Sequence, residues 1–110
     1  MKIYTRAGIA TLNNIEIQPY HNNPYANPNK FQFGKIDVRE CFWDSYCFEL
    51  LSDATYKFWV EHRDMDGIFD SEEIDLSDED KNYIKTLHRD YIGSMLKSYI
   101  NIMKGNYIIW

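Results

Sequence analysis

The chain has 110 residues, of which 45% are hydrophobic and 16% aromatic, so it can bury a core of the size that a single domain needs. Its formal net charge of −5 argues against RNA or DNA as a direct ligand, and no apolar run approaches the roughly 20 residues that cross a bilayer. The start of the chain also lacks the long apolar stretch of a signal peptide. We therefore expect one domain, residues 1–110, in the cytoplasm and without a membrane partner.

Residues 1–20 have the alternation of a hairpin or a pair of short strands. Ile3 and Thr5 alternate with polar neighbours, Asn13-Asn14 is a candidate turn, and Ile15 and Ile17 would lie in the returning strand. The segment 19–30 contains all three prolines, which predicts a loop. That loop is either a connector or a recognition loop that displays Tyr20, His21 and Tyr25.

Alternation continues in the middle of the chain. Residues 31–38 predict a strand with a bulge at Gly34, and residues 56–61 predict another. Residues 39–51 fit either a helical face or a hairpin around Asp44-Ser45, and their aromatic content favours strands. The two cysteines, Cys41 and Cys47, are too few for a disulfide framework, so we expect free and mostly buried thiols.

The C-terminal third predicts one long helix over about 78–104. Ser77 and Asp80 form a capping pair, and three acids occupy the first turn, where the helix dipole favours them. Apolar residues recur every three or four positions from Ile84 onward, and Gly105 would end the helix. We expect this apolar stripe to cover the sheet rather than to form a dimer face, with the tail from 106 as an edge strand or packing segment. The predicted fold is α+β: a small antiparallel sheet of four to six strands (residues 1–76) packed against this helix.

Acidic residues are concentrated in residues 61–80. This segment contains ten carboxylates and one formal positive charge, a net charge of −9, whereas the other ninety residues contain eleven Lys and Arg against seven acids, a net charge of +4. Carboxylates packed this closely repel one another unless a cation, a basic partner or water compensates them. The segment is therefore the main candidate for a functional surface.

Part of that segment resembles an EF-hand calcium loop. If Gly67 is taken as its sixth position, Asp64, Asp66, Asp70 and Glu73 fall on positions that supply calcium ligands in that family. The first position is His62, which suits calcium poorly, and the motif occurs only once. The same residues also fit a hairpin in which residues 64–67 form a tight turn, the interpretation that we favour.

No catalytic motif is present. The three histidines, His21, His62 and His88, form no known constellation with nucleophiles or acids, and phosphate-binding glycine loops are absent. A small enzyme or a structural subunit of a larger complex remains an alternative. We expect no catalytic residues and no cofactor.

The hypothesis that we favour is a non-enzymatic inhibitor that occupies the basic, nucleic-acid-binding surface of a partner protein such as a nuclease. The profile resembles, in type and without a shared motif, phage anti-defence proteins of the anti-CRISPR or antirestriction kind and toxin-immunity proteins. Exposed aromatics such as Trp59 and Tyr83 would anchor the contact. The predicted partner-binding residues are Trp59, Glu61, Asp64, Asp66, Asp70, Glu72, Glu73 and Asp75, with Asp78 and Glu79 continuing the surface. The alternative is a calcium-binding module that uses Asp64, Asp66, Asp70 and Glu73 of the loop 62–73.

Overall fold

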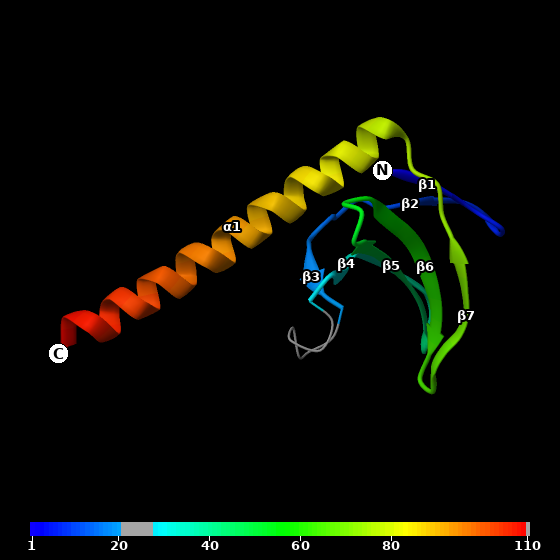
Figure 1. The fold of residues 1–110 in the computed structure, drawn as a ribbon. Coiled ribbons are helices and arrows are strands. Elements are labelled where there is room, and N and C mark those ends of the chain that lie inside the picture. The colour runs from blue at the N-terminus through cyan, green and yellow to red at the C-terminus, as the bar shows by residue number, and fades with distance from the viewer. Residues whose placement is uncertain (21–27, 110) are drawn as a thin grey trace.

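Seven strands and one long helix make up the described part of the chain (Figure 1). The computed structural model describes the backbone of residues 1–20 and 28–109 and the side chains of residues 1–20 and 28–98. The elements in chain order are β1 (Lys2–Thr5), β2 (Gly8–Thr11), β3 (Gln18–Pro19), β4 (Lys30–Arg39), β5 (Phe42–Leu50), β6 (Tyr56–Asp64), β7 (Gly67–Glu73) and α1 (Asp78–Ile109).

The strands form two antiparallel sheets. β1 and β2 pair as a separate hairpin, and the other five strands form a sheet in the order β3-β4-β5-β6-β7. Within each sheet, sequential strands are therefore neighbours, as short connections favour. β7 lies at one edge of the larger sheet and leads directly into α1 (Figure 1).

The core lies between one face of the five-stranded sheet, the β1–β2 hairpin and the first half of α1. Its fully buried side chains include Phe33, Phe48 and Val60 from the sheet and Ile84 from the helix. Gly34 is buried under the hairpin, and a Cβ there would lie 2.9 Å from a methyl group of Leu12, so glycine allows the close approach. The predicted bulge at this residue is confirmed by the register shift between Gln32 and Gly34.

The prediction of an α+β fold with a C-terminal helix is confirmed, but the helix covers the sheet only over its first half. His88 and Tyr91 pack against Phe31, with ring centroids 4.6 and 5.7 Å apart. Beyond them the helix extends away from the sheet (Figure 1), and Ile92 and Leu96 are 47% and 59% exposed. The apolar stripe is thus a core seam through Tyr91 and an uncovered surface at residues 92–96.

The helix begins where the sequence predicted. The backbone N–H of Asp80 donates to the Ser77 side-chain oxygen at 3.1 Å, which confirms the capping pair. The helix does not end at Lys104, because it continues through Gly105 to Ile109. The tail, predicted as an edge strand or packing segment, is therefore helical as far as Ile109. Trp110 lies outside the described residues. No helix in the described part of the chain is long and apolar enough to cross a membrane.

Two hairpins share one turn design. Asp64 accepts a hydrogen bond from the Asp66 N–H at 2.8 Å, and Thr5 accepts one from the Ala7 N–H at 3.2 Å. In each hairpin the next residue, Gly67 or Gly8, has a φ of 124°, a conformation that side chains disfavour. The predicted turn at residues 64–67 is confirmed. The predicted turn at Asn13-Asn14 is wrong: the chain reverses at Arg6-Ala7, and Ile15 and Ile17 precede the short strand β3.

Residues 39–51 form strands, as favoured, but the turn is not at Asp44-Ser45. Those two residues lie inside β5, opposite Ile36 and Lys35, and the chain reverses at Glu40-Cys41. Cys41 adopts a φ of 65° in this turn and is exposed, so only Cys47 is the buried free thiol that the sequence predicted. Most of the predicted loop 19–30, with His21 and Tyr25, lies outside the described residues.

Candidate functional site

The register of the sheet separates its side chains into two faces. Tyr46, Val60 and Glu72 stand side by side on the face that the helix and hairpin cover. The opposite face, which we call the open face, carries the alternate residues of the same strands: Ser45, Cys47, Glu49, Lys57, Trp59, Glu61, Ser71 and Glu73. Neighbouring acids in the sequence, such as Glu72 and Glu73, therefore point to opposite sides of the sheet.

Glu61 is the centre of a buried polar network on the open face. Its residue is only 4% exposed, and its carboxylate accepts hydrogen bonds from the Tyr20 hydroxyl at 2.6 Å and the Trp59 indole N–H at 3.0 Å. Arg63 donates two more, from Nη2 at 2.8 Å and Nε at 3.2 Å. Burial alone would raise the pKa of Glu61, but these hydrogen bonds outweigh it and hold the pKa below its usual value. Glu61 is thus an internally neutralised anion.

The same network fixes two aromatic side chains. The ring centroids of Tyr20 and Trp59 lie 6.3 Å apart with an interplanar angle of 57°. The Tyr20 hydroxyl and the Trp59 indole N–H both donate hydrogen bonds to Glu61. Burial and the bond to Glu61 raise the pKa of Tyr20 to about 12, so its hydroxyl stays protonated. The indole of Trp59 is therefore held in one orientation on the open face.

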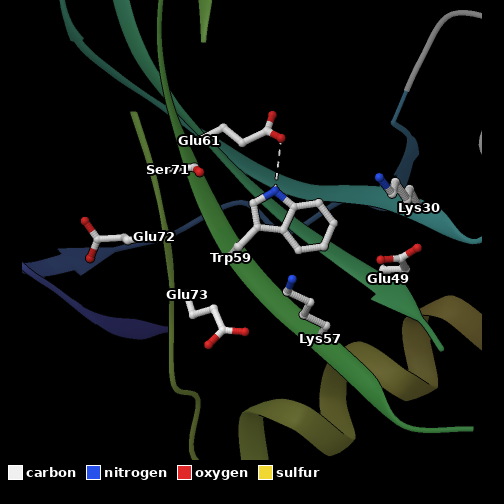
Figure 2. Close-up of a pocket in the computed structure, with 8 residues that line it drawn as sticks. All are labelled: Lys30, Glu49, Lys57, Trp59, Glu61, Ser71, Glu72 and Glu73. Atoms are coloured by element: carbon white, nitrogen blue, oxygen red, sulfur yellow. Dashed lines mark hydrogen bonds between the residues drawn. The ribbon is translucent and has the colours of Figure 1, made fainter. Parts of the chain in front are cut away.

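A cavity of about 390 Å³ surrounds this indole, and we call it the Trp59 cavity (Figure 2). Its lining residues are Lys30, Glu49, Lys57, Trp59, Glu61, Ser71, Glu72 and Glu73. Figure 2 shows Trp59 in the middle of this group and the Glu72 carboxylate directed away from it. The cavity is thus an aromatic surface surrounded by charged groups of both signs.

A second charged network lies on the covered side, near the tip of the β1–β2 hairpin. Arg6 pairs with Glu72 at 2.9 Å and with Asp70 at 2.5 Å, and His62 lies between Asp44 at 2.6 Å and Glu72 at 3.2 Å. Burial would lower the pKa of His62, but hydrogen bonds to the two carboxylates reverse that effect and raise the pKa. Asp70 and Glu72 therefore connect the hairpin to the sheet.

Five further acids of the segment lie along β7 and its connections to β6 and α1, where the backbone of Asp75 forms an isolated bridge with Tyr4 of β1. Asp66 is in the turn before β7, Glu73 ends β7, and Asp75 follows it; Asp78 and Glu79 begin α1. All five are exposed, and no ion pair to any described side chain neutralises them. We call Asp66, Glu73, Asp75, Asp78 and Glu79 the acidic edge. From Asp66 to Asp75 it spans roughly 30 Å at about 3.3 Å per residue.

The predicted site residues are thus distributed over four places. Trp59, Glu61 and Glu73 are on the open face, Asp70 and Glu72 bind Arg6, and Asp64 stabilises the turn. Asp66 and Asp75, with Asp78 and Glu79, belong to the acidic edge, which also includes Glu73. The structure does not bring all of these carboxylates onto one face.

The four residues of the calcium alternative do not converge either. Asp70 is paired with Arg6, Asp64 accepts from its own turn, and Glu73 projects from the opposite face to Asp70. Among the described residues no group of three or more His, Cys, Asp or Glu side chains is arranged to hold a metal ion. The D-x-D-G pattern matches the hairpin turn in which it is found.

Sequence reasoning missed the residues that compensate the acids. Arg6 lies more than sixty positions from Glu72, and Tyr20 lies forty-one positions from Glu61, so no local pattern links them. Lys57 and Ser71 carry a signal that alternation could have found. Lys57 lies two residues before Trp59, and Ser71 two residues before Glu73, so strand alternation places each pair on the same face of the sheet. Pairing the two strands through the turn at residues 64–67 would then have placed all four at the same cavity.

Comparison with protein-family models, with curated proteins and with solved structures finds no match to this chain. Function is therefore inferred from the geometry and charge of the chain itself.

Proposed function

We propose that the protein is a non-enzymatic cytoplasmic binding protein that presents its acidic edge to the basic, nucleic-acid-binding surface of a partner protein and thereby inhibits that partner. The observation that carries the proposal is the contrast between two sets of acids. Glu61, Asp70 and Glu72 are neutralised within the fold, whereas the acids of the acidic edge are exposed and form no ion pair with any described side chain.

The position of these charges supports a partner of opposite charge. Five exposed carboxylates on one sheet edge and the adjoining helix start repel one another, and a basic surface would relieve that repulsion. Helix-dipole attraction already compensates Asp78 and Glu79 in part, whereas Asp66, Glu73 and Asp75 have neither a helix dipole nor an ion pair with a described side chain. Complementary charge also speeds the encounter and makes it sensitive to salt.

The spacing of the charges supports competition with nucleic acid through charge rather than through close imitation. Three carboxylates over roughly 30 Å are sparser than duplex phosphates, which supply one charge per about 1.7 Å of axis. A few of them can still face a row of lysines or arginines on the partner. Affinity beyond that requires an anchor side chain, because exposed ion pairs contribute only about 0.2–1 kcal/mol each.

The experiment compares three forms of the protein as baits in a host lysate. In the edge variant Asp66, Asp75 and Glu79 are changed to Lys; in the matched control the exposed acids Glu16, Glu40 and Asp90, which lie elsewhere, are changed to Lys. The two variants have the same composition of charges. We expect the wild type and the control to capture the same basic protein, released between about 0.05 and 0.5 M salt as screening increases. Equal capture by the edge variant would contradict the proposal.

A further inference from the structure

The Trp59 cavity combines a fixed aromatic ring with an exposed carboxylate, that of Glu73, which forms no ion pair with any described side chain. The indole is held by its bond to Glu61, and Glu61 is in turn held by Tyr20 and Arg63. A ring whose orientation is fixed before binding loses little entropy when a ligand stacks on it. The cavity therefore offers a prepared stacking surface.

The charges around the ring can be assigned one by one. Glu61 is paired with Arg63, and Glu72 is paired with Arg6 on the other side of the sheet. Glu49 lies in register with Lys30 on one neighbouring strand and with Lys57 on the other, and it forms no ion pair with any described side chain. Glu73, directly opposite Trp59 on β7, has no ion pair with any described side chain. Glu73 is therefore the carboxylate whose strand position allows it to share a ligand with the indole.

We propose that the Trp59 cavity binds an arginine side chain of a basic protein partner, with the guanidinium stacked on the Trp59 indole and donating two hydrogen bonds to the Glu73 carboxylate. The identity of that partner as a basic protein rests on the proposed function. A planar guanidinium meets both groups at once, because it stacks on aromatic faces and donates two parallel hydrogen bonds to a carboxylate. A lysine ammonium can make the ion pair but lacks the planar face.

Lys57 gives the proposal a further test. It lines the same cavity on the strand of Trp59 and is exposed, and it has no ion pair of its own among the described residues. Its ammonium raises the positive potential at the place where a guanidinium would bind. Removing that charge should therefore strengthen binding of arginine, whereas removing the charge of Glu73 should weaken it.

The test is an NMR titration that follows the indole N–H resonances, with that of Trp59 assigned from a Trp59→Phe variant. The probes are the peptide acetyl-Gly-Arg-Gly-amide and its citrulline analogue, which keeps the shape and loses the charge. We expect the arginine peptide to shift the Trp59 resonance with millimolar affinity and the citrulline peptide to bind at least about fivefold more weakly. The Trp43 resonance, from the ring that Lys35 already covers at 5.3 Å, should stay unchanged.

Three variants complete the test. We expect Glu73→Gln to weaken the arginine peptide about fivefold, Lys57→Met to tighten it, and the matched control Glu40→Gln to leave it unchanged. Equal binding of the citrulline peptide, or no shift of Trp59 up to about 20 mM arginine peptide, would overturn the proposal. Such a result would not affect the capture experiment with the edge variant, because that variant does not alter Glu73. Conversely, peptide binding together with capture that ignores the edge variant would remove the proposed function alone.

Discussion

Replacing Glu61 by glutamine tests whether its buried carboxylate holds the open face together. The carboxylate accepts four hydrogen bonds, two of them from Arg63, and it is shielded from water. Glutamine keeps one acceptor oxygen and replaces the other by a donor, so about two bonds are lost and the Arg63 charge is left without its partner. Hydrogen bonds to charged groups contribute about 1.5–3 kcal/mol each.

The expected destabilisation of Glu61→Gln is about 2–4 kcal/mol, at the lower end of the simple sum because the Arg63 side chain is 28% exposed and water can reach it. Urea unfolding followed by circular dichroism at pH 7 measures this value, and the melting temperature should fall by about 10–20 °C. Tyr20→Phe, which removes one donor and leaves the ion pair intact, serves as the comparison and should cost less.

The destabilisation by Glu61→Gln should depend on pH. The folded pKa of Glu61 is lowered, so its stabilisation is present above the unfolded value of about 4.3 and is lost as pH falls through the folded pKa. The difference between wild type and Glu61→Gln should therefore shrink between pH 7 and pH 3. A destabilisation below about 0.5 kcal/mol at pH 7, or one that is the same at both pH values, would refute the reasoning.

Three further outcomes follow from the fold. His62→Gln should destabilise more at pH 5.5 than at pH 9, because the raised pKa of His62 makes its stabilisation complete below about 6.5 and lost as pH rises through the folded pKa; equal effects in urea unfolding would contradict this. Phe48→Ala, at a fully buried site, should cost about 3–5 kcal/mol in the same assay, and a cost under 1 kcal/mol would mean that the core is packed differently. Ser77→Ala should cost about 1 kcal/mol and reduce helical signal before global unfolding; no change would show that the cap is dispensable.

Local chemistry made parts of the fold predictable. The turn at residues 64–67 needs a side-chain acceptor followed by a glycine with positive φ, and the cap at Ser77 needs an oxygen three residues before an N–H, so adjacent residues determine both. The Thr5 to Gly8 turn has the same design and carried the same signal. Asn13-Asn14 drew the prediction away from it because asparagine pairs are common in turns.

The features that the sequence did not reveal depend mainly on contacts between residues that are far apart in the chain. Residues 61–80 look uniformly acidic in the sequence. Glu61, Asp70 and Glu72 are nevertheless neutralised within the fold, and the sequence did not show this because Arg6 and Tyr20 lie far from them along the chain. Strand register then placed Glu72 and Glu73 on opposite faces. The helix end was equally hidden, because Gly105 is tolerated inside a helix at a cost of about 1 kcal/mol and need not stop it.

The most direct test of the central claim is a competition between this protein and nucleic acid for the captured partner. Labelled duplex DNA or RNA is bound to the partner, and the protein is titrated in at about 0.1 M salt with anisotropy as the readout. We predict that the wild type and the control variant release the nucleic acid and that the edge variant releases it at least tenfold less effectively. Release that is equal for the edge variant, or a complex in which partner, nucleic acid and this protein are bound together, would contradict the account.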